Sequence, residues 1–181
     1  MRVIAGSLRG RRLKAPDWDG LRPTSDKLRE TLFNILAPRV AGARVFDGYA
    51  GTGALGIEAM SRGAASVTFV ERDPRAQKLI AENLVRCDLT SGCVIIRASV
   101  ARAIDDFTHA QDSFDLILLD PPYDETADGV VAGAGALLAQ SGVLVLEHAR
   151  RQPSAASAGR LSRTRQLVAG DSALSFYSCL P

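Results

Sequence analysis

The tetrapeptide Asp120-Pro121-Pro122-Tyr123 closes an apolar run that begins at Phe114, and its residue types suit chemistry on an aromatic amine. Two consecutive prolines fix φ at about −65° and keep the segment extended and rigid. Prolines donate no hydrogen bond, so the carbonyls of Asp120 and Pro121 and the Asp120 carboxylate remain as acceptors. The Tyr123 ring offers a flat surface on which a base can stack, an interaction worth about 1–3 kcal/mol.

An exocyclic amine on a purine or pyrimidine is a poor nucleophile, because its lone pair is delocalised into the ring. Hydrogen bonds from its two N–H groups to the Asp120 side chain and the Pro121 carbonyl would favour a pyramidal nitrogen. The same oxygens would stabilise the positive charge that develops on nitrogen. We therefore predict Asp120, Pro121 and Tyr123 as catalytic residues for a direct in-line displacement, in which the enzyme mainly supplies orientation.

A glycine-rich loop, Gly51-Thr-Gly-Ala-Leu-Gly56, lies between a short apolar run and a helical pattern. Gly51 and Gly53 allow a ligand to approach the backbone closely, and the helix N-terminus offers free N–H groups. The spacing also satisfies GxGxxG, so a dinucleotide cofactor is an alternative. Asp47 distinguishes the two, because a carboxylate there repels a pyrophosphate but can hold an ammonium group. Asp47 thus favours S-adenosylmethionine.

Glu71 ends the next apolar run, at a position where a carboxylate can accept both ribose hydroxyls of either cofactor. It completes the set of cofactor-binding residues predicted from strand ends and the glycine loop. That set is Asp47, Gly51, Gly53, Glu71 and Asp120.

Short apolar runs alternate with amphipathic ones through the middle of the chain. This alternation predicts a parallel sheet with helices on both faces. Ligands bind at the carboxyl ends of the strands in such sheets, which is where the motifs fall. Strands are expected at residues 45–46, 67–70, 94–96, 114–119 and 143–146, and helices at 54–62, 74–86, 100–107 and within 127–139.

The two ends of the chain carry weaker patterns. Residues 1–16 place β-prone stretches around two glycines, which predicts a small hairpin or an extended arm. Residues 24–36 have helical spacing, with Thr24 or Ser25 as the cap. An irregular connection is expected at 151–163, followed by an antiparallel hairpin at the sheet edge from 166–168 and 174–179.

Length and composition predict a single domain. The chain has 181 residues, of which 46% are hydrophobic, and we divide it into a basic arm (1–22) and a catalytic core (23–181). The three cysteines form no CxxC pair and both histidines lie far from them in sequence, so neither a metal site nor a disulfide is expected. No run approaches the roughly 20 apolar residues of a membrane span, and a cytoplasmic protein without a membrane partner is expected.

Charge is segregated along the sequence. Residues 1–44 hold 10 Lys and Arg against 4 Asp and Glu, residues 45–149 hold 7 against 15, and residues 150–181 hold 5 against 1. The basic ends of the chain indicate binding to a polyanion, whereas the acidic middle indicates a different function.

The motifs together resemble one family, the bacterial 16S ribosomal RNA guanine-N2 methyltransferases named for guanine 966. The resemblance extends over essentially the whole chain. Asp-Pro-Pro-Tyr is shared with other amino methyltransferases, whereas the segments between Arg2 and Asn34 resemble this family in particular. The similar segments are Arg2 to Gly6, Arg9 to Leu13, Leu21 to Asn34, Asp47 to Glu58, Ser61 to Ala64, Val70-Glu71, Asp120 to Tyr123, Gly170-Asp171 and Phe176-Tyr177.

The resemblance implies a Rossmann-like class I methyltransferase fold with a mainly parallel seven-stranded sheet, and S-adenosylmethionine as cofactor. It implies a guanine amine of 16S rRNA as the acceptor, in the 30S subunit or an assembly intermediate, and a monomeric enzyme. Arg22, Thr24, Arg29 and Glu30 would line the RNA side of the active site. In the basic arm, Arg9, Arg11 and Arg12 are expected to contact phosphates.

Two departures from the family pattern are visible. Residues 97–100 lack the acidic residue that many relatives of this fold use for the adenine amino group, so Ser99 or the backbone is expected to substitute. Gly48 and Tyr49 replace a more usual Leu-Phe or Leu-Tyr pair.

Three alternatives remain. The first is an amino methyltransferase acting on another RNA or DNA base, such as adenine at N6. The second is a nicotinamide-dependent oxidoreductase, which leaves Asp-Pro-Pro-Tyr unexplained and lacks a Tyr-x-x-x-Lys motif. The third is an RNA-binding protein without catalysis, against which the intact Asp120 and Tyr123 argue.

Overall fold

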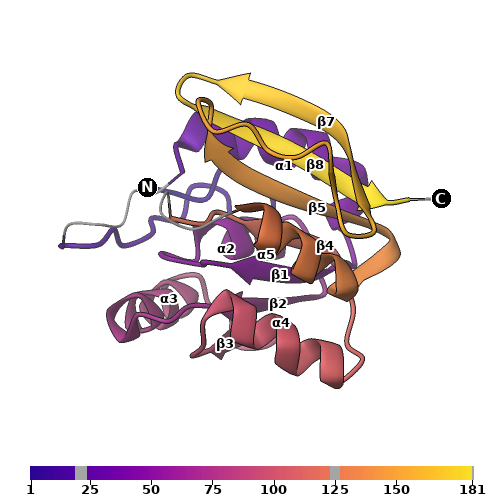
Figure 1. Cartoon of the computed structure of the whole chain (residues 1–181). Helices are drawn as coiled ribbons and strands as arrows, with labels where there is room; N and C mark the ends of the chain where they lie inside the picture. Colours follow the sequence, from indigo (N-terminus) through magenta and orange to yellow (C-terminus); the bar gives the residue numbers. More distant parts are fainter. Residues whose placement is uncertain (19–23, 123–126, 181) are drawn as a thin grey trace.

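The computed structural model of the chain describes residues 1–18, 24–122 and 127–180, and it shows a central sheet between two layers of helices (Figure 1). The elements in chain order are α1 (Asp26–Val40), β1 (Arg44–Gly48), α2 (Ala54–Ser61), β2 (Ser66–Val70), α3 (Pro74–Arg86), β3 (Cys93–Ile96), α4 (Val100–His109), β4 (Phe114–Leu119), α5 (Ala127–Ala134), the 3₁₀ turn η1 (Gly135–Leu137), β5 (Leu138–Ala149), β6 (Ser157–Ala158), β7 (Leu161–Ala169) and β8 (Ser172–Cys179).

The sheet has the strand order β3-β2-β1-β4-β5-β8-β7-β6. Strands β1 to β5 pair in parallel, while β8, β7 and β6 continue the sheet in antiparallel fashion. This confirms the Rossmann-like α/β fold and its C-terminal hairpin. The expected number of strands was wrong, because the two-residue strand β6 pairs with β7 and adds an eighth strand to the seven that the resemblance implied.

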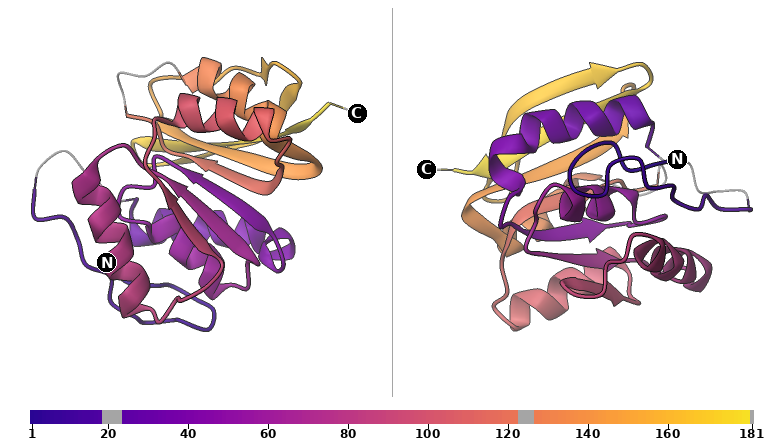
Figure 2. Two further views of the ribbon diagram at one scale, coloured as in Figure 1. Left: turned by 90° about the horizontal axis from the view of Figure 1, so that it is seen from below. Right: turned by 180° about the vertical axis from the view of Figure 1, so that it is seen from behind.

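Helices cover both faces of the sheet, as predicted. Helices α1, α2 and α3 share one apolar cluster with strand residues such as Val45 and Leu118. Helices α4 and α5 share a second cluster with Phe46 and Leu119 on the opposite face. The right panel of Figure 2 looks onto the α1 side, where the N-terminal segment crosses in front of α2. We call this side the α1 face.

Local sequence signals explain where the helices begin. Ser25 caps α1 by accepting a hydrogen bond from the N–H of Leu28, so of the two predicted caps Ser25 is the one used. Asp73 caps α3 in the same way, and Pro74 occupies the first helical turn, where a missing N–H costs nothing. Both caps lie where the helical spacing of apolar residues begins, and α3 spans residues 74–86 as predicted.

The C-terminal third differs most from the prediction. Strand β5 runs from Leu138 to Ala149 where residues 143–146 were expected, because it pairs with β4 on one side and β8 on the other. Strand β7 begins at Leu161, inside the segment predicted to be irregular, because its first residues pair with both β6 and β8. Partners distant in sequence therefore extend both strands beyond their apolar runs.

The N-terminal arm closes into a hairpin-like loop, with one antiparallel bridge between Arg2 and Arg12. The arm contributes to the core, because Val3 and Leu13 are buried in the same cluster as α1 and α2. The buried Glu58 of α2 accepts hydrogen bonds from two backbone N–H groups of the arm. The arm is therefore packed onto the domain and forms part of its α1 face.

Candidate active site

Three carboxylates from different strands lie at the carboxyl edge of the parallel sheet: Asp47 of β1, Asp120 directly after β4, and Glu147 of β5. Leu119 pairs with Leu146, so Asp120 and Glu147 are the next neighbours beyond that pair. Both leucines face α4 and α5. Side chains alternate between the two faces along a strand, so Asp120 and Glu147 belong to the opposite face, the α1 face. Leu118, the strand partner of Asp47, also belongs to the α1 face.

This edge is acidic and poorly solvated. Burial raises the pKa of Asp47 to about 8; the N–H of Gly56, 2.9 Å from Asp47 Oδ2, opposes the shift, and the charge of Glu71 adds to it. Burial also raises the pKa of Asp120 well above its usual value, and the charges of Glu147 and Asp47 contribute. In the described part of the chain, no Lys or Arg forms an ion pair with Asp47 or Asp120. A cationic ligand would therefore stabilise the ionised site.

The glycine loop turns sharply between β1 and α2. Tyr49, Gly51 and Gly53 all have positive φ, at 63°, 55° and 76°. Gly53 forms the N-cap of α2 in this left-handed conformation, which an L side chain adopts only at a cost. The predicted cofactor loop thus has the backbone geometry that its two glycines allow.

Glu71 lies at the end of β2 and holds this loop in place. Its Oε2 accepts a hydrogen bond from the backbone N–H of Gly51 at 2.9 Å, and its Oε1 accepts one from the backbone N–H of Asp73 at 2.9 Å. The structure thus brings Glu71, Gly51 and Asp47 together through the loop. A carboxylate has about four lone-pair sites, so these contacts are compatible with the predicted bonds to ribose hydroxyls.

The remaining predicted residues occupy varied surroundings. Ser99 is exposed and caps α4 through the N–H of Arg102 at 3.2 Å, so a contact with adenine stays a prediction. Pro121 is half-buried beside Asp120. Tyr123 and Arg22 lie outside the described residues.

Glu147 is an acid that our sequence analysis did not identify. It follows the apolar run 143–146 and so occupies the same kind of strand end as Glu71 and Asp120. That position was a usable signal. The hydroxyl of Thr24 donates a hydrogen bond to Glu147 Oε2 at 3.0 Å, which brings the chain just before α1 to the site.

Two of the predicted phosphate contacts, Arg9 and Arg12, are exposed on the arm. Arg11 is also exposed, and it pairs with Asp88 at 2.8 Å and donates to the carbonyl of Arg86. The positions of these three side chains are compatible with binding to a polyanion.

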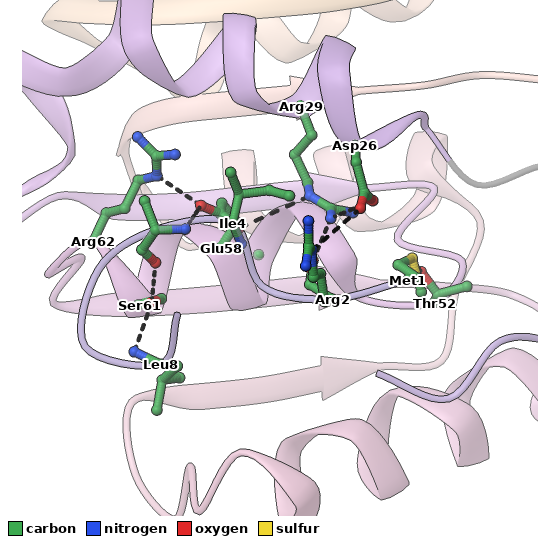
Figure 3. Close-up of polar contacts among 12 residues, drawn as sticks. Met1, Arg2, Ile4, Leu8, Asp26, Arg29, Thr52, Glu58, Ser61 and Arg62 are labelled. Atoms are coloured by element: carbon green, nitrogen blue, oxygen red, sulfur yellow. Dashed lines mark hydrogen bonds and ion pairs between the residues drawn. The ribbon is translucent and has the colours of Figure 1, made fainter. Parts of the chain in front are cut away.

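The prediction for Arg29 needs correction, because this side chain is 0% exposed and cannot line an RNA surface. Figure 3 shows it reaching from α1 toward the arm, where it donates to the carbonyl of Arg2 and the carboxylate of Asp26. Its Nε lies 3.9 Å from the equally buried Glu58. Arg29 therefore fastens the arm to α1 and α2, whereas Glu30, the next residue, is exposed.

The arrangement suits a cation held beside hydrogen-bond acceptors. The described residues include no cluster of His, Cys, Asp and Glu that could hold a metal ion. None of the helices in the described part is long and apolar enough to cross a membrane. A positively charged ligand fits this edge of the sheet better than a pyrophosphate does, because the pyrophosphate would meet Asp47 and Asp120 with like charge.

Comparison with known proteins gives consistent matches. The family described as conserved hypothetical protein 95 matches residues 1–178. YlbH of Bacillus subtilis is 37% identical over 180 residues, which is 98% of each chain. Ribosomal RNA small subunit methyltransferase D of Escherichia coli K12 is 39% identical over 123 residues, 68% of this chain and 60% of that protein. The solved structure of yhhF from Escherichia coli has a TM-score of 0.85 at 28% identity and covers 100% of this chain and 98% of its own.

Proposed function

Since the chain belongs to the conserved hypothetical protein 95 family and is an S-adenosylmethionine-dependent methyltransferase, we propose that it methylates the exocyclic N2 amine of a guanine in 16S ribosomal RNA. The name of the Escherichia coli relative supports the ribosomal small subunit as the source of the RNA. We further propose that the substrate is the 30S subunit or an assembly intermediate, and that the enzyme acts as a cytoplasmic monomer.

The observation that carries this proposal is the acidic edge of the sheet, where Asp47 is buried and Asp120 is half-buried. Bound S-adenosylmethionine supplies a methyl group activated by a sulfonium, together with an ammonium group. Asp47 would hold the ammonium group, Glu71 the ribose hydroxyls, and the backbone at Gly51 and Gly53 would line the ligand. A nicotinamide dinucleotide fits poorly, because its pyrophosphate would meet the carboxylates of Asp47 and Asp120.

Asp120 would orient the acceptor amine. Its carboxylate and the carbonyl of Pro121 can accept both N–H groups, which favours a pyramidal nitrogen with its lone pair directed at the methyl group. Bound S-adenosylmethionine would supply the methyl group in a direct displacement, with the carbon–sulfur electron pair staying on sulfur, and the nitrogen would release one proton to solvent. A cation in the site lowers the pKa of Asp120 from its raised value and so keeps the acceptor ionised.

Replacement of Asp120 tests the proposal. Asp120→Asn keeps the size of the side chain but exchanges one acceptor oxygen for a donor, so kcat for methyl transfer to unmodified 30S subunits should fall about 10²- to 10³-fold. Calorimetric affinity for S-adenosylmethionine should fall far less than kcat does, because Asp47 and Glu71 would still hold the ligand. Mass spectrometry of the RNA should find N2-methylguanosine with the wild-type enzyme.

Asp112→Asn serves as the control, because Asp112 lies just before β4, at the end opposite Asp120, and pairs with Arg44. Its kcat should match that of the wild type. Methylated adenine as the product would support an N6 amino methyltransferase instead. Cofactor binding without transfer to any RNA would favour a non-catalytic RNA-binding protein.

A further inference from the structure

Glu147 has no role in the proposed transfer, yet it lies beside the residue that would hold the amine. The pairing of Leu119 with Leu146 puts Asp120 and Glu147 on neighbouring strand ends. Adjacent strands are about 4.8 Å apart. Burial raises the pKa of Asp120, and the charge of the neighbouring Glu147 raises it further.

Glu147 is also held in position from the RNA side of the site. Thr24 donates to its Oε2 at 3.0 Å, and Thr24 directly precedes the cap of α1. On the other side of β5, the strand partner of Glu147 is the buried and apolar Leu174 of β8. The carboxylate therefore belongs to the α1 face, together with Asp120. A carboxylate has about four lone-pair sites, so acceptance from Thr24 is compatible with acceptance from a base.

The Watson–Crick edge of guanine explains why a second acid would be useful here. Guanine presents two adjacent kinds of donor on this edge, the N2 amine and the N1–H group. If the Asp120 turn holds the amine, the N1–H group is the next donor along the same edge. We propose that Glu147 is the specificity-determining residue that accepts a hydrogen bond from N1–H of the target guanine, an inference that rests on the proposed function.

The same contact would reject other amino bases. Adenine has an acceptor at N1 and cytosine has one at N3, next to their exocyclic amines, and either lone pair would face the carboxylate of Glu147. A site built around a donor in the substrate discriminates against an analogue that lacks it, because a lone pair in place of the donor repels the carboxylate. One such contact typically changes base preference by roughly 5- to 150-fold.

The test uses two RNA substrates that differ at N1 and C6. One carries guanine at the target position, and the other carries 2-aminopurine, which keeps the amine at position 2 but has a lone pair at N1 in place of N1–H and no oxygen at C6. Comparison of the enzyme variants on the same pair of substrates isolates the contact at N1. The wild-type enzyme should prefer the guanine RNA by about 10- to 100-fold in kcat/KM. Glu147→Gln should lower this ratio at least about tenfold, because the amide of Gln can donate to N1 of 2-aminopurine.

The ratio is measured within each variant, so a general loss of activity cancels. Calorimetric binding of S-adenosylmethionine verifies that the Glu147→Gln enzyme is folded. Glu82→Gln is the matched control, since Glu82 lies on α3 and pairs with Lys14 at the surface; its ratio should equal that of the wild type.

The outcomes separate the two hypotheses. If the wild-type enzyme methylates neither RNA, the proposed function fails. If it methylates guanine and the Glu147→Gln variant keeps the wild-type ratio, the role of Glu147 in reading N1–H is refuted while the proposed function stands.

Discussion

Asp47 illustrates how a single residue can weaken the fold while serving the site. Its side chain is buried, and its pKa of about 8 in the folded protein compares with an ordinary value of 3.8. A carboxyl group with a raised folded pKa contributes stability that is fully present below the unfolded pKa and is lost as pH rises through the folded pKa. In the absence of a cation, Asp47 should therefore destabilise the protein progressively between about pH 4 and pH 8.

Asp47→Asn should reverse this effect. The amide removes the titrating group but keeps an oxygen for the N–H of Gly56. Without cofactor, the variant should be more stable than the wild type at pH 8 by on the order of a few kcal/mol, and this gain should shrink toward pH 5. Urea unfolding at the two pH values measures it. Affinity for S-adenosylmethionine should fall roughly 10- to 100-fold, because a charge-assisted hydrogen bond is lost. A stability gain that is equal at both pH values would contradict the burial argument.

Sequence reasoning reached the strand-end acids because each follows an apolar run. Asp47, Glu71 and Asp120 were found in this way, and Glu147 could have been. Arg29 was misplaced because its position on the RNA side was carried over from the family resemblance. Its spacing from Phe33 and Leu36 put it on the buried stripe of α1, and the buried countercharge on α2 became evident only in three dimensions.

At the scale of elements, the third glycine of the loop determines how closely α2 approaches β2. A Cβ atom on Gly56 would lie 2.3 Å from the Phe69 ring and 2.7 Å from Val67. These contacts are too short for a methyl group, so the helix or the ring would have to move. Because Asp47 accepts from the N–H of Gly56, such a shift would also disturb the cofactor loop.

Gly56→Ala should therefore lower the free energy of unfolding by about 1–3 kcal/mol, as measured by urea denaturation. Gly133→Ala is the matched control on α5, since its Cβ would meet Ile104 at an ordinary 3.6 Å. That change should be neutral or stabilise the protein by up to about 1 kcal/mol, because alanine restricts the unfolded chain. Equal effects of the two substitutions would show that helix propensity, and not close packing, dominates at Gly56.

The elements best predicted were those whose local signals agree. Helix α3 has a cap, a proline at its start and clear apolar spacing, while β4 ends in four consecutive apolar residues, Leu116 to Leu119, followed by Asp120. Strands β5 and β7 were underestimated because cross-strand partners define their lengths. In β7, exposed Thr164 and Arg165 continue a strand that pairs with β8. Such long-range pairing leaves no signature in a short window of sequence.

At the scale of the whole molecule, the arm is fastened to the domain by polar contacts. Besides the bonds to Glu58, the buried side chain of Asn83 on α3 accepts from the N–H of Lys14 and donates to the carbonyl of Thr52 in the glycine loop. One residue thus connects the arm, α3 and the cofactor loop. The arm's arginines are consequently held on a fixed backbone, which would lower the ordering cost if they bind RNA as predicted.

If the arm's arginines contact RNA phosphates, replacing them should change how steeply RNA affinity falls with salt concentration. Replacement of Arg9 and Arg12 by Ala removes two exposed charges, while Arg11, which already pairs with Asp88, is left in place. Each phosphate contact contributes about 0.7–0.9 to the slope of log affinity against log salt concentration, so the slope should become shallower by roughly 1.4–1.8.

The control variant replaces Arg44 and Arg102, which carry the same total charge on β1 and α4. Fluorescence anisotropy with a 16S rRNA fragment at several salt concentrations measures both. If the two double variants lose the same slope, net charge alone attracts the RNA and the arm provides no specific contact; if only the Arg9 and Arg12 variant changes, the arm contacts phosphates directly.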